Sequence, residues 1–122
     1  MFQRRSHAWK RLFNLHWDGL DFHTMNFQSF KASLTQAQPP KGLSSILQAM
    51  WHDAIGDWDR AHDLAQSEKS AAGSWVHAYL HRVEGDIGNA GYWYGRAGKP
   101  ACTSELAEEW VQICKELLAA EA

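Results

Sequence analysis

The stretch GDIGNAGYWYGRAGKP, residues 85–100, decides the fold, because it fits either a helix or a glycine-rich loop that holds a phosphate. Its glycines at 88, 91, 95 and 98 step by three, four and three residues, which places them on one face of a helix. A phosphate loop of the G-x-G-x-x-G type needs a G-x-G element, and this stretch has none. We therefore predict a helix and keep an ordered loop as the alternative.

The glycine face needs an explanation of its own. A glycine inside a helix costs about 1 kcal/mol relative to alanine, so several on one face require a compensating gain. We expect that another backbone packs closely against this face. Close approach of a ligand is the second explanation.

The Gly-Asp pair that opens the stretch occurs twice in the chain, at residues 56–57 and 85–86. The same offset of 29 residues aligns three further features, which are Trp58 with Ile87, His52 with His81, and Ala61 with Ala90. A helical hairpin needs a glycine in its turn, a capping aspartate and a small residue where the helices approach. The sequence therefore predicts two repeat-like hairpins.

Apolar residues recur at helical spacing along most of the remaining chain. We expect helices within residues 26–36, 43–55, 58–69, 75–84 and 104–119, with breaks at PPKG (39–42) and SAAGS (70–74) and with Ser104 as the cap of the last helix. No stretch alternates with the period of a strand. We predict an all-α fold of stacked antiparallel helical hairpins with a C-terminal capping helix, forming one domain over residues 25–122.

The spacing of apolar and small residues after each Gly-Asp pair resembles the turn and second helix of tetratricopeptide-type repeats. The matching residues are Gly56, Trp58, Ala61 and Ala65 in the first unit and Gly85, Ile87, Ala90, Tyr94, Ala97 and Pro100 in the second. The resemblance spans residues 43–118, although the two units are closer together than the usual spacing of about 34 residues. The chain also resembles small bacterial proteins. The repeat resemblance implies binding of a protein or peptide and brings no catalytic residues.

Composition excludes several classes of function. The net charge of −2 over 122 residues argues against general nucleic-acid binding. Two cysteines, Cys102 and Cys114, are too few for a disulfide framework or a cysteine-only zinc site, and we expect reduced thiols in the cytoplasm. No apolar run of about 18 residues is present, so we expect no membrane span. The oligomeric state stays open.

Residues 1–24 differ in composition from the rest and form a basic amphipathic pattern. The basic residues are Arg4, Arg5, Lys10 and Arg11, and the apolar ones include Trp9, Phe13 and Trp17. We expect an N-terminal extension outside the domain. The alternatives are a helix packed on the domain and a membrane-surface or targeting segment. Met25 is a second candidate start of translation.

The segment HAYLHRVE contains the sharpest candidate for chemistry. His77 and His81 are four residues apart and Glu84 follows three residues later, so a helix presents all three on one face. Two imidazoles and a carboxylate are a plausible ligand set for zinc or iron. His52 aligns with His81 in the repeat and is our candidate for a third nitrogen. The alternative is that these histidines cap helices or stack on tryptophan and bind no metal or other cofactor.

Function is predicted at the level of class. An aromatic group, Trp75, Tyr79, Tyr92 and Trp93, is our candidate surface for a protein or peptide partner, with burial in the core as its alternative. We favour a small interaction module that is not an enzyme. The alternative is a metal-binding protein or a metal-dependent hydrolase that uses the His-x3-His pair.

Overall fold

The chain is all-helical over residues 25–121, which are the residues that the structure, a computed structural model, describes. This part contains six α-helices, one 3-10 turn and no strand, as predicted. The elements are α2 (Phe27–Ala32), η1 (Ser33–Thr35), α3 (Ser45–Ala54), α4 (Trp58–Ser67), α5 (Ala71–Glu84), α6 (Ile87–Ala97) and α7 (Leu106–Glu121). The prediction for residues 1–24 lies outside the described residues.

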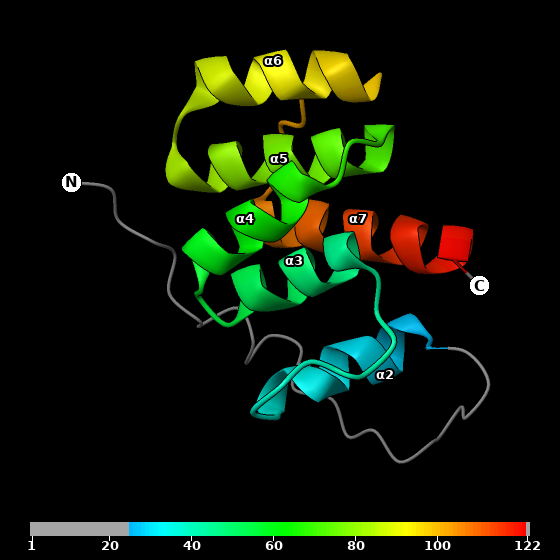
Figure 1. The fold of residues 1–122 in the computed structure, drawn as a ribbon. Coiled ribbons are helices and arrows are strands. Elements are labelled where there is room, and N and C mark those ends of the chain that lie inside the picture. Colours follow the sequence, from blue (N-terminus) through cyan, green and yellow to red (C-terminus); the bar gives the residue numbers. More distant parts are fainter. Residues whose placement is uncertain (1–24, 122) are drawn as a thin grey trace.

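Two helical hairpins, α3–α4 and α5–α6, are stacked so that α4 packs against α5 (Figure 1). The last helix, α7, contacts α3, α5 and α2, so it covers both hairpins instead of extending the stack beyond α6. In Figure 1, α6 and α2 lie at opposite ends of the molecule. Helix α5 is consequently the central element, because it contacts α3 and α4 of the first hairpin, α6 of its own hairpin, and α7.

The turns of the two hairpins have the same hydrogen bonds. Gly56 and Gly85 have φ angles of 93° and 88°, in the left-handed region that glycine adopts without steric cost. The next residues, Asp57 and Asp86, cap α4 and α6 by accepting hydrogen bonds from the backbone N–H three residues later. The small residue predicted at each helix approach is buried, as Ala61 and Ala90 are at most 2% exposed.

The glycine-rich stretch 85–100 is helical from Ile87 to Ala97. Gly98 has a φ angle of 70° and ends the helix, so only Gly88, Gly91 and Gly95 lie on its glycine face. At each of these three, a Cβ would meet no atom within 4 Å beyond its own helical turn. Our expectation that another backbone packs here is wrong for the described part of the chain, because α6 is an edge helix and this face points away from α5.

Two predicted boundaries are also wrong. The break before α5 is shorter than SAAGS, because Ser70 caps the helix and residues 71–74 belong to its first turn. Helix α7 begins at Leu106, and its first helical hydrogen bond runs from the Glu109 N–H to the Glu105 carbonyl, so Ser104 is not its cap. The Ser104 hydroxyl instead lies 3.0 Å from Cys102 Sγ. In both cases serine is a residue type that suits either a helix cap or a loop, so the sequence leaves the exact start of the helix open.

The core is built around large aromatic side chains. Trp51, Trp110 and Tyr79 are fully buried, and each indole N–H finds an acceptor, Ser33 Oγ for Trp51 and the Met50 carbonyl for Trp110. Satisfying these donors avoids the cost of an unpaired polar group in the interior. None of the helices between residues 25 and 121 is long and apolar enough to cross a membrane.

Candidate metal centre

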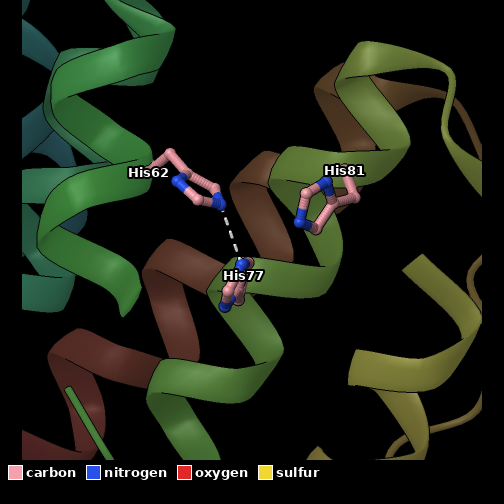
Figure 2. A group of neighbouring side chains, drawn as sticks. All are labelled: His62, His77 and His81. Atoms are coloured by element: carbon pink, nitrogen blue, oxygen red, sulfur yellow. Dashed lines mark hydrogen bonds between the residues drawn. The ribbon is translucent and has the colours of Figure 1, made fainter. Parts of the chain in front are cut away.

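Helices α4 and α5 bring three histidines together. His62 projects from α4, and His77 and His81 project from successive turns of α5, as Figure 2 shows. One ring nitrogen from each histidine lies within 4.8 Å of the other two. We refer to His62, His77 and His81 as the histidine cluster.

The local sequence explains why the three rings meet. His77 and His81 share a face of α5 because residues four apart are neighbours on a helix. Trp58 and His62 have the same spacing on α4, and Trp58 anchors that face to α5 by donating from Nε1 to the Leu80 carbonyl at 2.8 Å. The contact between the two hairpins therefore directs His62 toward the histidine pair.

The rings are held by direct contacts. His62 Nε2 and His77 Nε2 are 2.9 Å apart, a hydrogen bond in which one nitrogen carries the proton and the other accepts it (Figure 2). Trp58 stacks on His62 with centroids 4.8 Å apart, and Trp93 of α6 stacks on His77 at 4.0 Å. The ring of His77 also stacks on that of His81 at 4.8 Å. Packing thus limits the positions that the three rings can adopt.

Burial and the neighbouring imidazoles favour the neutral form of His62 and His77. Burial lowers the pKa of His77 to about 4, with further lowering from His62 and His81. Burial, followed by the charge of His81, also lowers the pKa of His62. Neutral imidazole is the form that binds metal ions, so His62 and His77 are in the ligand-competent state at neutral pH.

A carboxylate approaches the cluster from the other side of His81. Glu84 Oε1 lies 3.2 Å from His81 Nδ1, and Glu84 and Asp86 form a second group of potential ligand atoms with His81. Asp86 is exposed and already caps α6, so this second group opens to solvent. Of our four predicted metal residues, His77, His81 and Glu84 are therefore close together.

The fourth predicted residue, His52, lies elsewhere. Its ring packs edge-on against Trp51 on α3, and it belongs to none of the possible ligand groups among the described residues. His52 is on α3, whereas the helix that brings a third imidazole to His77 and His81 is α4. The third nitrogen comes from His62 instead. The offset of 29 residues aligns His62 with Gly91, so comparing the two repeats does not identify His62 as a ligand. Its spacing of four residues from the apolar Trp58 does indicate that His62 lies on the same, inward face of the helix.

The four aromatic residues of the predicted binding surface do not form one surface. Tyr79 is fully buried and Trp75 is 6% exposed beneath Lys99, whose Nζ lies 4.1 Å from the ring centroid. Trp93 is half-buried against His77. Only Tyr92 is widely exposed, at 57%. The alternative of burial in the core therefore describes Trp75 and Tyr79.

No protein-family model, curated protein or solved structure matches this chain. The resemblance to tetratricopeptide-type repeats consequently stays a prediction. Among the described residues, the histidine cluster is the arrangement with the most definite chemistry.

Proposed function

We propose that this protein binds a divalent transition-metal ion, with zinc as the first candidate and iron as the second, through His62, His77 and His81. The observation that supports the proposal is the convergence of three ring nitrogens, from two helices, within 4.8 Å of one another. Three histidines are an established ligand set for zinc, in which the fourth position holds a water molecule or another ligand.

The ligand type indicates the class of ion. Imidazole nitrogen suits zinc, copper, iron and nickel, whereas magnesium and calcium prefer oxygen ligands. The cluster itself offers nitrogen only, and its nearest carboxylate, Glu84, is engaged with His81 Nδ1. We therefore expect binding of zinc and no competition from magnesium or calcium at millimolar concentration.

The distances fit such an ion after a small adjustment. Two nitrogen ligands of a tetrahedral zinc ion, each 2.0–2.1 Å from the metal, are about 3.3 Å apart. His62 Nε2 and His77 Nε2 are 2.9 Å apart, and no ligand pair of the cluster exceeds 4.8 Å. Binding requires the hydrogen bond between His62 and His77 to open, because both nitrogens must present lone pairs. The closest pair therefore has to move apart slightly, and the more distant pairs have to move together, for one ion to contact all three nitrogens.

Calorimetric titration of metal-stripped protein with zinc chloride tests the proposal. We expect one equivalent to bind to the wild type, and affinity to fall at least about tenfold in His62→Ala and His81→Ala, since each loses one ligand. His52→Ala is the matched control, because it removes a histidine outside the cluster and should bind like the wild type. Absence of binding in the wild type, or equal affinity in His62→Ala with its helical circular dichroism intact, would refute the metal site.

Binding of a protein or peptide stays a second candidate function, and the outer face of α6 favours it. Ile87 and Tyr92 are the most exposed large apolar side chains of the described residues, at 65% and 57%. They flank the unpacked glycines of the same helix, along which a partner helix can approach closely because glycine has no side chain. We propose that an amphipathic helix of a partner protein binds there.

Site-specific cross-linking tests this second function. A photoreactive phenylalanine analogue in place of Tyr92 should give one discrete adduct in cells of the source organism. Gly91→Leu should abolish the adduct by filling the glycine face, whereas Asp63→Leu, on the exposed side of α4, should not. An adduct that persists in Gly91→Leu, or no adduct at all, would argue against partner binding at α6.

A further inference from the structure

Glu84 occupies a position that the turn itself does not explain. It is the last residue of α5, where the partial negative charge of the helix C-terminus disfavours an acidic side chain. The equivalent position of the other hairpin, 29 residues earlier, is Ile55, and that turn has the same left-handed glycine and the same aspartate cap. An acid is therefore not required for the turn to form.

The contact of Glu84 supplies a different reason for its presence. Its Oε1 lies 3.2 Å from His81 Nδ1, and the side chains of His81 and Glu84 are 9% and 29% exposed. A carboxylate at this distance accepts a hydrogen bond from the N–H of a neutral imidazole, so the ring nitrogen that faces it is the one that carries the proton. With Glu84 as the acceptor, the neutral tautomer of His81 that makes this bond has its proton on Nδ1 and its lone pair on Nε2.

The other ring nitrogen of His81 faces the rest of the cluster. Figure 2 shows one nitrogen of His81 directed toward the space between His62 and His77, with the second nitrogen on the far side of the ring. Because Nδ1 is the nitrogen in contact with Glu84, the one that faces the cluster is Nε2. A lone pair on Nε2 is what a metal ion between the three histidines requires.

The equivalent histidine of the first hairpin provides an internal comparison. His52 aligns with His81, has Ile55 in place of Glu84, and its buried Nδ1 has no hydrogen-bond partner in the described part of the chain. His52 also contacts no second histidine among the possible ligand groups. The carboxylate thus accompanies the histidine that lies in the cluster and is missing beside the one that does not.

We propose that Glu84 is a positioning residue of the metal site, which fixes the tautomer and the ring orientation of His81 so that Nε2 faces the metal. This inference rests on the proposed metal binding and specifies how the site is prepared for it. Carboxylates that hold the outer nitrogen of a ligating histidine raise its basicity, and their loss commonly reduces metal affinity about 10- to 100-fold.

Two measurements test the role of Glu84 separately from metal binding. In metal-free protein at pH 7.5, ¹⁵N NMR of the histidine side chains should show His81 protonated on Nδ1 in the wild type. Glu84→Ile, which installs the residue of the equivalent turn, should move the proton of His81 toward Nε2. Glu84→Gln should retain the wild-type tautomer, because its amide oxygen still accepts the bond.

Zinc titration of the same variants completes the experiment. We expect affinity to fall about 10- to 100-fold in Glu84→Ile and by less in Glu84→Gln, with unchanged thermal unfolding of the metal-free proteins. If the wild type binds no zinc, the metal site itself fails while the tautomer measurement still reports on Glu84. If zinc binds with equal affinity to Glu84→Ile, or His81 keeps its tautomer in that variant, the positioning role is overturned although the metal site stands.

Discussion

A buried carboxylate, Glu109 of α7, connects its helix to α5 and α6, because it contacts one side chain from each of them. It is 1% exposed, accepts a hydrogen bond from the Tyr94 hydroxyl of α6, and pairs with Arg82 of α5 at 2.8 Å. Arg82 also donates to the Ser104 carbonyl ahead of α7. Burial on its own would lower the pKa of Arg82, but the hydrogen bond and charge of Glu109 outweigh it and raise the pKa. Burial, followed by the bond to Glu109, raises the pKa of Tyr94.

Tyr94→Phe should destabilise the protein by about 1–3 kcal/mol, because it leaves a buried carboxylate oxygen without its hydroxyl donor. Urea unfolding followed by circular dichroism measures the change. Tyr92→Phe is the matched control, since its hydroxyl is on the surface and the loss should stay within about 0.5 kcal/mol. Equal stability of Tyr94→Phe and Tyr92→Phe would show that the Tyr94–Glu109 bond does not hold α6 and α7 together.

The lowered pKa of His77 predicts acid sensitivity of the metal-free protein. In the unfolded chain His77 binds a proton below about pH 6.5, whereas the folded state resists protonation until about pH 4. Its contribution to stability is therefore complete above pH 6.5 and is lost as the pH falls toward 4.

The free energy of unfolding, measured in urea with a chelator present, should fall from pH 7 to pH 5. The slope of this free energy against pH reports how many protons the chain takes up on unfolding. In His77→Phe, which retains an aromatic ring against Trp93, that number should be lower by up to about one proton. The slope that remains comes from groups such as His62, whose pKa is also lowered. An unchanged slope in His77→Phe would contradict the buried, neutral state of this histidine.

At the scale of single elements, α6 is a helix that carries glycines for no reason internal to the described chain. Gly91→Ala should stabilise the isolated protein by about 0.8–1 kcal/mol, because alanine is the better helix former and its methyl group meets no other side chain. Gly85→Ala should instead be destabilising, since the φ angle of 88° is strained for any side chain. Thermal unfolding compares the two. A loss of stability in Gly91→Ala would mean that the glycine face is packed in solution.

The sequence was informative about the elements because local rules determine them. Helical spacing predicts the helices, and the two Gly-Asp pairs predict both hairpin turns with their caps. The predicted start of α5 is wrong because serine and glycine in SAAGS are typical of a break, whereas Ser70 caps the helix by accepting from the Gly73 N–H.

At the scale of the whole molecule, the candidate site depends on which helices become neighbours. His77 and His81 are predictable as a pair from their spacing alone. The third histidine is not, because both His52 and His62 precede the pair on separate helices, and only the packing of α4 on α5 selects His62. The same arrangement explains why Tyr92 is exposed and Tyr79 is buried, because α6 lies at the edge of the molecule and α5 at its centre.

A metal that links α4 to α5 should stabilise the whole fold. An ion that binds only the folded state adds about 2.7 kcal/mol when its free concentration is 100 times the dissociation constant. Zinc should therefore raise the thermal unfolding midpoint of the wild type, and magnesium should not. A midpoint that zinc leaves unchanged, at a concentration shown to saturate the protein, would place the bound metal outside the α4–α5 contact.

The most direct test of the metal centre is ¹⁵N NMR of the histidine side chains during titration with zinc. We predict that the Nε2 resonances of His62, His77 and His81 change together, reach their end point at one equivalent, and report proton-free, metal-bound nitrogen, while His52 is unaffected. Saturation without change at these three residues, or changes centred on other histidines, would contradict the account of the histidine cluster as a metal site.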